Sequence, residues 1–599
     1  MAHFFDDERL LAPPRALREQ RADGSFVLRS PEPLRPHVRC IGEWLEHWAR
    51  ETPEAPALAE RDAAGGWRLL SWGEVRRHVG RLAQGLLALE LPPGAPVVVL
   101  SDNSVDHALL ALAAMHVGRP ACTVSSAYSR LGPDFSRIRG ILHKLRPGLV
   151  YASDAAVYGA ALRAAEVDAV VVLGRGAEEV PGARSFDSLV SEAEGPEVMR
   201  AFAAIRPEDH AKYLLTSGST GHPKVAINTH RMLCANQQMI SQAWRFLDHE
   251  KPVLLDWLPW SHTFGGNHNF NMVLSHGGTL YIDDGRPMPG LIERTVRNLR
   301  EVQANIHFNV PRGLDMLLPY LEQDEALARR MFEGLRVLFY AGAGLAPSSW
   351  KRLEAVAARV RAEPLWLTTS WGSTETAPAV TSAHWRLDGA GCIGGPLPGA
   401  ELKFVPNGQK LEMRVRGAGV FPGYRDDPEL SAAAFDEEGF YRIGDAGRLV
   451  DEVHPEKGVL FDGRVAEDFK LGSGTWVSVG TLRVKLISAL APLVQDAVIT
   501  GHDRDQVGAL LFLTPAAEAL APEQLREELK AKLQALHEQS GGSAQSPGRV
   551  LLLKEPASLA AGEITDKGYL NQRAVIARRA AEVEALYADA ADPRVIRVG

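Results

Sequence analysis

The sequence predicts an α/β fold, followed by an antiparallel β unit and a small α+β region at the C-terminal end. Between residues 41 and 245, short β-branched runs alternate with helical patterns, which predicts parallel sheets with helices on both faces. From Gly394 onward, hydrophobic residues recur with period two between glycine turns, a pattern typical of antiparallel strands. Residues 466–599 mix strand and helix patterns. A chain of 599 residues is long enough to form more than one domain.

The individual elements follow from local patterns. Residues 1–40 are rich in Arg and Pro and show little periodicity, so we expect an extended arm that lies on the first domain. Ser71, with Glu74 three residues later, predicts a capped helix start. Helical patterns predict further helices at residues 41–50, 105–117, 230–245, 522–536 and 571–588. Short apolar runs predict strands at residues 67–70, 96–100, 121–125, 149–152, 169–173, 476–479, 496–500 and 508–513.

Composition and charge exclude several protein classes. The net charge of −8, from 66 basic and 74 acidic residues, argues against a general nucleic-acid-binding protein. No apolar run is long enough to span a bilayer, and the N-terminus lacks the apolar core of a signal peptide. Cys40, Cys122, Cys234 and Cys392 lie far apart and fit neither a zinc ribbon nor a disulfide framework. The sequence therefore predicts a cytoplasmic enzyme for small molecules, without nucleic-acid or integral membrane contact.

A loop rich in glycine and hydroxyl groups follows an apolar run that ends a predicted strand. Residues 213–224 read Y-L-L-T-S-G-S-T-G-H-P-K. The glycines allow positive φ and close backbone approach, the hydroxyls can donate to phosphate oxygens, and the lysine adds a positive charge. These features predict a polyphosphate-binding loop, although a surface turn explains the same residues equally well. The loop lacks the G-x-x-x-x-G-K-[ST] spacing of P-loop nucleotide hydrolases.

Two glycine-rich turns follow later strands. His262 lies in the segment 254–266, L-L-D-W-L-P-W-S-H-T-F-G-G, where a structural role explains a single histidine more simply than a catalytic one. A metal pair with His268 is disfavoured, because no third ligand has matching spacing. The strand V-L-F-Y at 337–340 runs into A-G-A-G at 341–344, a backbone edge that suits a flat ligand. A plain strand-to-helix turn fits equally well, and the turn lacks the G-x-G-x-x-G of dinucleotide-binding proteins.

Two further segments supply polar side chains of different kinds. Trp371 offers a ring for stacking on a base, Thr374 offers a hydroxyl, and Glu375 offers a hard oxygen ligand for Mg²⁺. We expect Asp445 in a turn after a short strand, where its carboxylate can accept two hydroxyls of a ribose. An ordinary Asx turn explains Asp445 as well. Arg464 is expected at the end of a strand.

Taken together, these motifs resemble the adenylate-forming acyl-CoA synthetase superfamily, which includes acetyl-CoA synthetase, 4-coumarate-CoA ligase and firefly luciferase. They occur in the family's order between Tyr213 and Lys567. The chain is most similar to feruloyl-CoA synthetases, through G-T-W-V-S-V-G at 474–480 and G-E-I-T-D-K-G-Y-L-N-Q-R-A-V at 562–575. The motifs that support the resemblance are T-S-G-S-T-G-H-P-K, L-P-W-S-H, W-G-S-T-E, V-R-G with F-P-G-Y, Y-R-I-G-D, D-G-R and the terminal lysine.

The resemblance implies a large N-terminal domain of stacked α/β subdomains plus a β unit, residues 1–464. It also implies a small, mobile C-terminal lid domain, residues 465–599. The implied reaction joins a carboxylate to the α-phosphate of ATP with Mg²⁺, releases pyrophosphate, and then lets the thiol of coenzyme A displace AMP. Ferulate and related hydroxycinnamates are the expected acids. A fatty-acyl or benzoyl-type ligase, a carrier-protein-loading enzyme and a nucleotide-binding sensor without turnover are the alternatives.

The resemblance also implies roles for individual residues. Lys567 bridges carboxylate and phosphate in the first step, and His262 gates the acyl site. Thr216 and Glu375 are the other two expected catalytic residues, and Glu375 helps to bind Mg²⁺. Trp371 packs on adenine, with residues 342–344 at the adenine edge. The expected nucleotide-binding residues are Thr216, Ser217, Gly218, Ser219, Thr220, Gly221, Lys224, Gly342, Ala343, Gly344, Trp371, Gly372, Thr374, and the ribose-binding Asp445 and Arg464. The expected acyl pocket contains His262, Phe264, Gly265, Gly266, Ala341 and Val380, with small residues leaving room for a ring.

The expected hinge departs from the family's pattern in two ways. The segment after Arg464 usually contains Lys-x-x-Gly, whereas Lys470 begins K-L-G-S-G, which is one residue longer. The usual Asp or Lys of the hinge is replaced by Ala466, which Glu467 and Asp468 follow.

Overall fold

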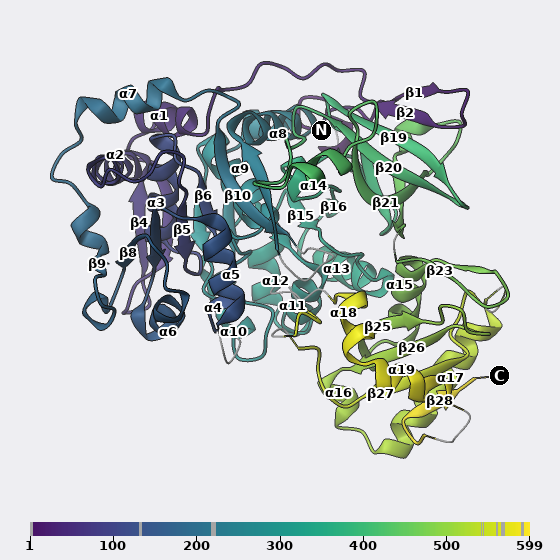
Figure 1. The fold of residues 1–599 in the computed structure, drawn as a ribbon. Coiled ribbons are helices and arrows are strands. Elements are labelled where there is room, and N and C mark those ends of the chain that lie inside the picture. The colour runs from purple at the N-terminus through teal and green to yellow at the C-terminus, as the bar shows by residue number, and fades with distance from the viewer. Residues whose placement is uncertain are drawn as a thin grey trace.

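The computed structural model describes residues 4–130, 135–216, 223–465, 467–540, 542, 544–558, 561–564, 570–588 and 592–598. Figure 1 shows a large N-terminal part, purple to green, and a smaller C-terminal part, yellow-green to yellow. The N-terminal part contains sheets with parallel strands and one large antiparallel sheet, and the C-terminal part has its own sheet. The predicted α/β fold with two domains of unequal size is thus confirmed, while the boundary at residues 464 and 465 stays a prediction.

The alternating runs of the first half form a seven-stranded sheet in which only β11, at one edge, is antiparallel to its neighbour. The central run V-V-V-L is buried throughout, which explains why it is apolar without alternation. The predicted capping box is confirmed, because Ser71 and Glu74 each accept a hydrogen bond from the other's backbone N–H. In spatial order the strands are β11 (Lys224–Thr229), β10 (His210–Thr216), β6 (Ala121–Thr123), β5 (Val97–Leu100), β7 (Leu149–Ala152), β8 (Val170–Leu173) and β9 (Arg184–Ser185). The helices of this region are α2 (Trp72–Ala88), α3 (Val105–His116), α4 (Ala127–Arg130), α5 (Ser136–Leu145), α6 (Ala155–Ala165) and α7 (Pro196–Ala204).

Two smaller sheets complete the α/β region. The carboxyl ends of two parallel strands lie side by side, because Tyr340 is opposite Thr369. Such ends are where α/β proteins bind ligands. The sheets are β12 (Val253–Asp256), β13 (Thr279–Ile282), β3 (Pro56–Arg61) and β4 (Trp67–Ser71), and β14 (Ile306–Asn309), β15 (Val337–Tyr340) and β16 (Leu367–Thr369). The helices are α1 (Gly42–Glu51), α8 (His230–Ala243), the π-helix η5 (Phe264–Asn269), α9 (Phe270–His276), α10 (Ile292–Glu301), α11 (Pro311–Gln323), α12 (Glu325–Phe332) and α13 (Pro347–Val360).

The predicted antiparallel β unit is an eight-stranded sheet that also recruits the N-terminal arm. The expectation of an extended arm was incomplete, since two segments of the arm are strands of this sheet. Figure 1 shows them in purple beside the green strands of residues 400–449, and Phe26 stacks on Phe404 with ring centroids 4.5 Å apart. The strands are β1 (Leu17–Gln20), β2 (Phe26–Arg29), β19 (Ala400–Asn407), β20 (Lys410–Gly417), β21 (Tyr441–Leu449), β22 (Val459–Arg464), β18 (Cys392–Pro396) and β17 (Thr381–Ser382), and α14 (Pro428–Ala433) lies between β20 and β21 in the chain.

The C-terminal part has a four-stranded sheet and a short hairpin. The single helix expected at 571–588 is interrupted at Arg579, whose guanidinium binds the carboxylate of the buried Glu563 at 2.7 and 3.0 Å. No helix among the described residues is both long and apolar enough to cross a membrane. The elements are β23 (Phe469–Lys470), β24 (Trp476–Val477), α15 (Val479–Leu490), β25 (Val494–Thr500), β26 (Gly508–Leu513), α16 (Pro515–Glu518), α17 (Pro522–Glu538), β27 (Arg549–Leu553), α18 (Gln572–Arg578), α19 (Ala580–Tyr587) and β28 (Val595–Arg597).

Lys410, at the start of β20, connects the two parts. Its ammonium pairs with the carboxylate of Asp468 and donates to Ser478 Oγ at 3.0 Å and to the Asp462 carbonyl at 2.5 Å. The Asp468 side chain is only 4% exposed and accepts a hydrogen bond from the Val479 amide, at the first residue of α15. Burial raises the pKa of Asp468, and the ammonium of Lys410 opposes that shift. One lysine of the N-terminal part therefore holds the first helix of the C-terminal part.

Candidate functional site

The predicted phosphate loop connects two antiparallel strands of the seven-stranded sheet. Thr216 ends β10 and lies opposite Lys224, the first residue of β11. The Lys224 ammonium lies 5.2 Å from the centroid of the Tyr424 ring. The expected loop residues outside the described part of the chain are Ser217, Gly218, Ser219, Thr220 and Gly221, and the same holds for Lys567. The described ends of the hairpin thus place a threonine and a lysine opposite each other in the ladder.

Glu375 lies beside this hairpin, in the 3-10 helix η6 (Thr374–Thr376). Tyr424 donates its phenolic hydrogen to Glu375 Oε1 at 2.9 Å, and Glu375 is buried. The Asn228 side chain of β11 donates to the Thr374 carbonyl at 3.2 Å, which ties η6 to the hairpin. Tyr424 had no expected role, although it ends the F-P-G-Y motif and has a hydroxyl suited to orient a carboxylate.

Trp371, Asp445 and Arg464 form a second polar group. The Trp371 indole N–H donates to Asp445 Oδ2 at 2.8 Å, and Arg464 Nε lies 3.3 Å from Asp445 Oδ1. Burial raises the pKa of Asp445, whereas Arg464 and the indole N–H favour the carboxylate. The predicted turn at Asp445 is wrong: the residue lies inside β21, opposite Arg464 on β22, at an irregularity of the ladder. Gly444, with φ +84°, also lies inside this strand, directly before the irregularity.

The glycine turns after β15 and β16 flank the second group. Gly342 has φ +89°, a conformation that favours glycine, and residues 342 and 344 are exposed. A Cβ on Gly372 would lie 1.7 Å from the Pro378 carbonyl oxygen, so only glycine fits there. A Cβ on Gly344 would lie 3.3 Å from a methyl of Val484 on α15. The C-terminal part therefore approaches the turn that was expected at the edge of adenine.

The expected acyl residues lie on and beside the π-helix η5. His262 is half-buried, and its carbonyl accepts a hydrogen bond from the Gly266 amide at 2.8 Å. Cβ atoms on Gly265 and Gly266 would lie 2.3 and 2.5 Å from the carbonyl oxygens of Leu258 and Trp260. These two glycines therefore accommodate close backbone packing, which differs from the ring-sized space that the sequence suggested. Val380 is buried, and Ala341 is half-buried at the end of β15.

An aromatic cluster follows Phe264 along the π-helix. His268, one turn later, packs on Phe339 at 5.3 Å and on Phe308 at 5.1 Å between ring centroids. Phe264 lies 5.6 Å from the Phe339 ring. Burial lowers the pKa of His268 to about 4, so its imidazole is neutral near pH 7. His268 thus belongs to a buried aromatic cluster that packs against Phe264.

These groups suit recognition of a polyanion that also bears a hydroxylated ring. A hydroxyl and an ammonium can bind phosphate oxygens, and a carboxylate oriented by Tyr424 is a hard oxygen donor of the kind that Mg²⁺ prefers. A carboxylate such as that of Asp445 can accept hydrogen bonds from hydroxyl groups. Among the described residues, the contacts bring Thr216, Lys224, Thr374 and Glu375 together in one group and join Trp371 to Asp445 in the other.

Comparison with known proteins gives consistent matches along most of the chain. Residues 45–425 match the family model AMP-binding enzyme, and residues 481–591 match the AMP-binding enzyme C-terminal domain. The chain is 29% identical over 520 residues to a probable nonribosomal peptide synthetase of Salinispora arenicola, covering 83% of this chain but only 6% of that protein. It is 25% identical over 513 residues to 4-coumarate–CoA ligase-like 9 of Oryza sativa, covering 83% and 87% of the two chains.

A solved structure has the same fold. The adenylation domain of a carboxylate reductase from Mycobacterium chelonae superimposes with a TM-score of 0.70 at 20% identity. The match covers 92% of this chain and 90% of that chain.

Proposed function

Because the chain belongs to the AMP-binding enzyme family, we propose that it joins a carboxylic acid to coenzyme A through an acyl-adenylate, at the expense of ATP. In the first step, the acid's carboxylate attacks the α-phosphorus of ATP and pyrophosphate leaves. In the second, the thiol of coenzyme A attacks the acyl carbon and AMP leaves. We place the nucleotide domain at residues 1–464, the lid at residues 465–599, and the enzyme in the cytoplasm.

One observation carries this proposal: Glu375, distant in sequence, lies beside Thr216 and Lys224 of the β10–β11 hairpin, through the contacts of Tyr424 and Asn228. Attack at phosphorus gathers negative charge on the phosphate oxygens and on pyrophosphate. Fixed cations and hydrogen-bond donors stabilise that charge most effectively. In this proposal Lys224 and the loop bind the phosphates, and Lys567 supplies the last positive charge.

Glu375 fits the proposed Mg²⁺ ligand. Tyr424 holds one of its oxygens at 2.9 Å, and the other accepts no hydrogen bond from the described residues. A bound Mg²⁺ would neutralise phosphate charge. The Glu375 carboxylate would supply an oxygen ligand beside the hairpin, and Tyr424 would orient that carboxylate.

Asp445 and Trp371 are proposed to hold the nucleoside. Asp445 accepts the ribose hydroxyls, and Arg464 and the indole N–H favour and orient its carboxylate against the effect of burial. The ring edge of Trp371 and the turn at residues 342–344 form the part of the proposed site that contacts adenine.

We propose an aromatic acid, with ferulate and related hydroxycinnamates first. The buried aromatic cluster of Phe264, His268, Phe308 and Phe339 includes one expected acyl residue, Phe264, and contact with that ring would favour an aryl group, because aromatic rings pack well edge to face. The name of the rice relative, a coumarate–CoA ligase-like protein, supports the same class. Likeness to a peptide synthetase and a reductase adenylation domain favours a carrier-bound thiol as the second candidate acceptor.

The test is ATP-dependent AMP release with ferulate, 4-coumarate, benzoate and octanoate, with and without coenzyme A. We expect AMP release that requires coenzyme A and is fastest with the hydroxycinnamates. Turnover with only benzoate or octanoate would support the ligase activity and contradict the assignment of a hydroxycinnamate as the substrate. Acid-dependent ATP–pyrophosphate exchange that coenzyme A does not discharge would favour the carrier-bound acceptor, and no exchange with any acid would favour a sensor.

Replacing Tyr424 by Phe should raise the Mg²⁺ concentration for half-maximal adenylation about ten-fold or more, since a hydrogen bond to a charged carboxylate is worth about 1.5–3 kcal/mol. The ring stays in place beside Lys224, so the unfolding temperature should change little. Initial rates against total Mg²⁺ at fixed ATP measure this effect. Tyr320→Phe, which removes an exposed bond to Glu293, is the matched control. An unchanged Mg²⁺ dependence in Tyr424→Phe would show that the tyrosine does not orient Glu375.

A further inference from the structure

We propose that Lys212 is a positioning residue for the acid side of the site, because its ammonium fixes the backbone of the π-helix that follows His262. The inference rests on the proposed function, since it concerns how the acid is held. Lys212 donates to the Gly266 carbonyl at 2.7 Å, and the Gly266 amide donates to the His262 carbonyl at 2.8 Å. Both hydrogen-bonding groups of Gly266 are therefore used, one toward each residue.

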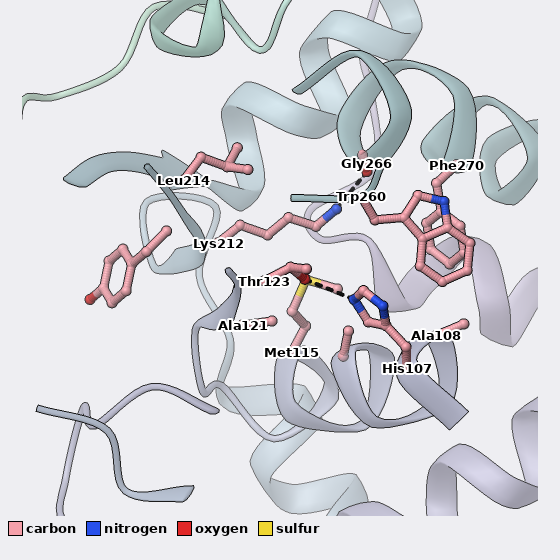
Figure 2. Close-up of a pocket in the computed structure, with 12 residues that line it drawn as sticks. His107, Ala108, Met115, Ala121, Thr123, Lys212, Leu214, Trp260, Gly266 and Phe270 are labelled. Carbon is pink, nitrogen blue, oxygen red and sulfur yellow. Dashed lines mark hydrogen bonds between the residues drawn. The ribbon is translucent and has the colours of Figure 1, made fainter. Parts of the chain in front are cut away.

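The Lys212–Gly266 hydrogen bond connects β10, which carries Thr216 of the proposed ATP side, to the π-helix η5 of the proposed acid side. Lys212 lies on β10, four residues before Thr216, with its side chain on the same face of the strand. The backbone of β10 is held between β6 and β11, so this strand is a fixed support. Figure 2 shows the side chain reaching from β10 to the π-helix, with the dashed bond to Gly266. A shift of η5 relative to β10 would thus break this bond.

In the described part of the chain, the ammonium of Lys212 does not serve to form an ion pair with an acidic side chain. No carboxylate among the described residues pairs with the ammonium, and burial lowers the pKa of Lys212 to about 7. Its neighbours are the Phe270 ring, centred 5.8 Å from Nζ, and a cavity of about 20 Å³, roughly the room for one water. A methionine would fill similar space without any desolvation of charge. The hydrogen bond to the Gly266 carbonyl therefore explains why a lysine occupies this position.

The other side of the cavity is polar but uncharged. His107 accepts or donates at Thr123 Oγ1 (2.8 Å) and contacts the Asp102 carbonyl through its other ring nitrogen at 3.2 Å. Burial lowers the pKa of His107 to about 4, so its neutral ring does not repel the ammonium. Trp260 packs against this ring with centroids 4.9 Å apart. The bond to Gly266 is then the one directional contact of the ammonium with the described residues.

The experiment compares the full-length wild type with Lys212→Met and Lys212→Gln. We expect Lys212→Met to raise the KM for the acid about ten-fold or more. A hydrogen bond from a charged donor is lost, and binding of the acid depends on ångström-scale placement of the backbone that this bond holds. The KM for ATP should stay within about two-fold, since β10 is held by its neighbours. Lys212→Gln keeps a donor without charge and should recover part of the acid affinity. Lys251→Met, at an exposed lysine over Trp48, is the matched control and should behave as wild type.

A second readout does not depend on turnover. Backbone amide exchange of residues 260–270, followed by mass spectrometry, should accelerate in Lys212→Met and stay unchanged in Lys251→Met. Unchanged exchange together with an unchanged acid KM would overturn the inference, as would equal rises of both KM values. If wild type shows no activity with any acid, the proposed function fails, and the exchange result still decides whether Lys212 fixes the π-helix.

Discussion

Replacing Lys567 by alanine should slow acyl-adenylate formation at least about 100-fold, because one preorganised charge at the transition state is typically worth that much. The thioester step, started from synthetic acyl-adenylate and coenzyme A, should stay within a few-fold of wild type. The reason is that the proposed lysine acts on the α-phosphate in the first step, where negative charge develops. Acid-dependent pyrophosphate release measures the first step, and thioester formation measures the second.

The control for this experiment is Lys554→Ala, which removes an exposed lysine from the same C-terminal part. It should leave both steps unchanged. Equal losses in the two half-reactions of Lys567→Ala would contradict a role confined to adenylation. A loss in the second step alone would assign the lysine to the thiol.

Replacing Asp445 by asparagine should raise the KM for ATP about 30- to 100-fold, which corresponds to about 2–3 kcal/mol. Aspartate gives one oxygen to the Trp371 indole N–H and the other to Arg464. An asparagine that keeps the indole bond turns its amide N–H₂ toward the guanidinium, and one that faces Arg464 loses the indole bond. Either orientation also removes one acceptor for the ribose. Because burial raises the pKa of Asp445, a neutral amide costs the fold little, and the unfolding temperature should stay close to wild type.

Nucleotide affinity is measured by steady-state kinetics and by equilibrium binding of AMP. Asp451→Asn, which loosens an ion pair with Lys457 in the loop after β21, is the matched control. An unchanged AMP affinity in Asp445→Asn would rule out the proposed ribose contact.

Local features of the fold could be predicted from the sequence, because they depend on neighbouring residues. The Ser71–Glu74 capping box and the apolar strand at 97–100 are of this kind. Pairings across long sequence separations could not. The stacking of Phe26 on Phe404, and with it the two strands of the N-terminal arm, depends on a sheet edge that forms only when distant residues meet.

The same division applies to the candidate site. Glu375, Trp371 and Asp445 could be named from their motifs. The contacts of Glu375 with Tyr424 and of Asp445 with Trp371 could not be predicted, because they join residues 49 and 74 positions apart. Asp445 was expected in a turn after a short strand, but pairing with β22 continues the strand through this residue. The roles of residues 217–221 and of Lys567 stay predictions, since these residues lie outside the described part of the chain.

The ion pair of Lys410 and Asp468 determines how easily the two parts of the chain can separate. If the C-terminal part acts as the proposed lid and turns away, both charges return to water, and their hydration offsets much of the lost attraction. The ion pair is therefore specific in its geometry yet costs little to separate, unlike an apolar interface of similar strength, which gains nothing from water when it parts. Such a contact suits the reversible motion that the proposed lid requires.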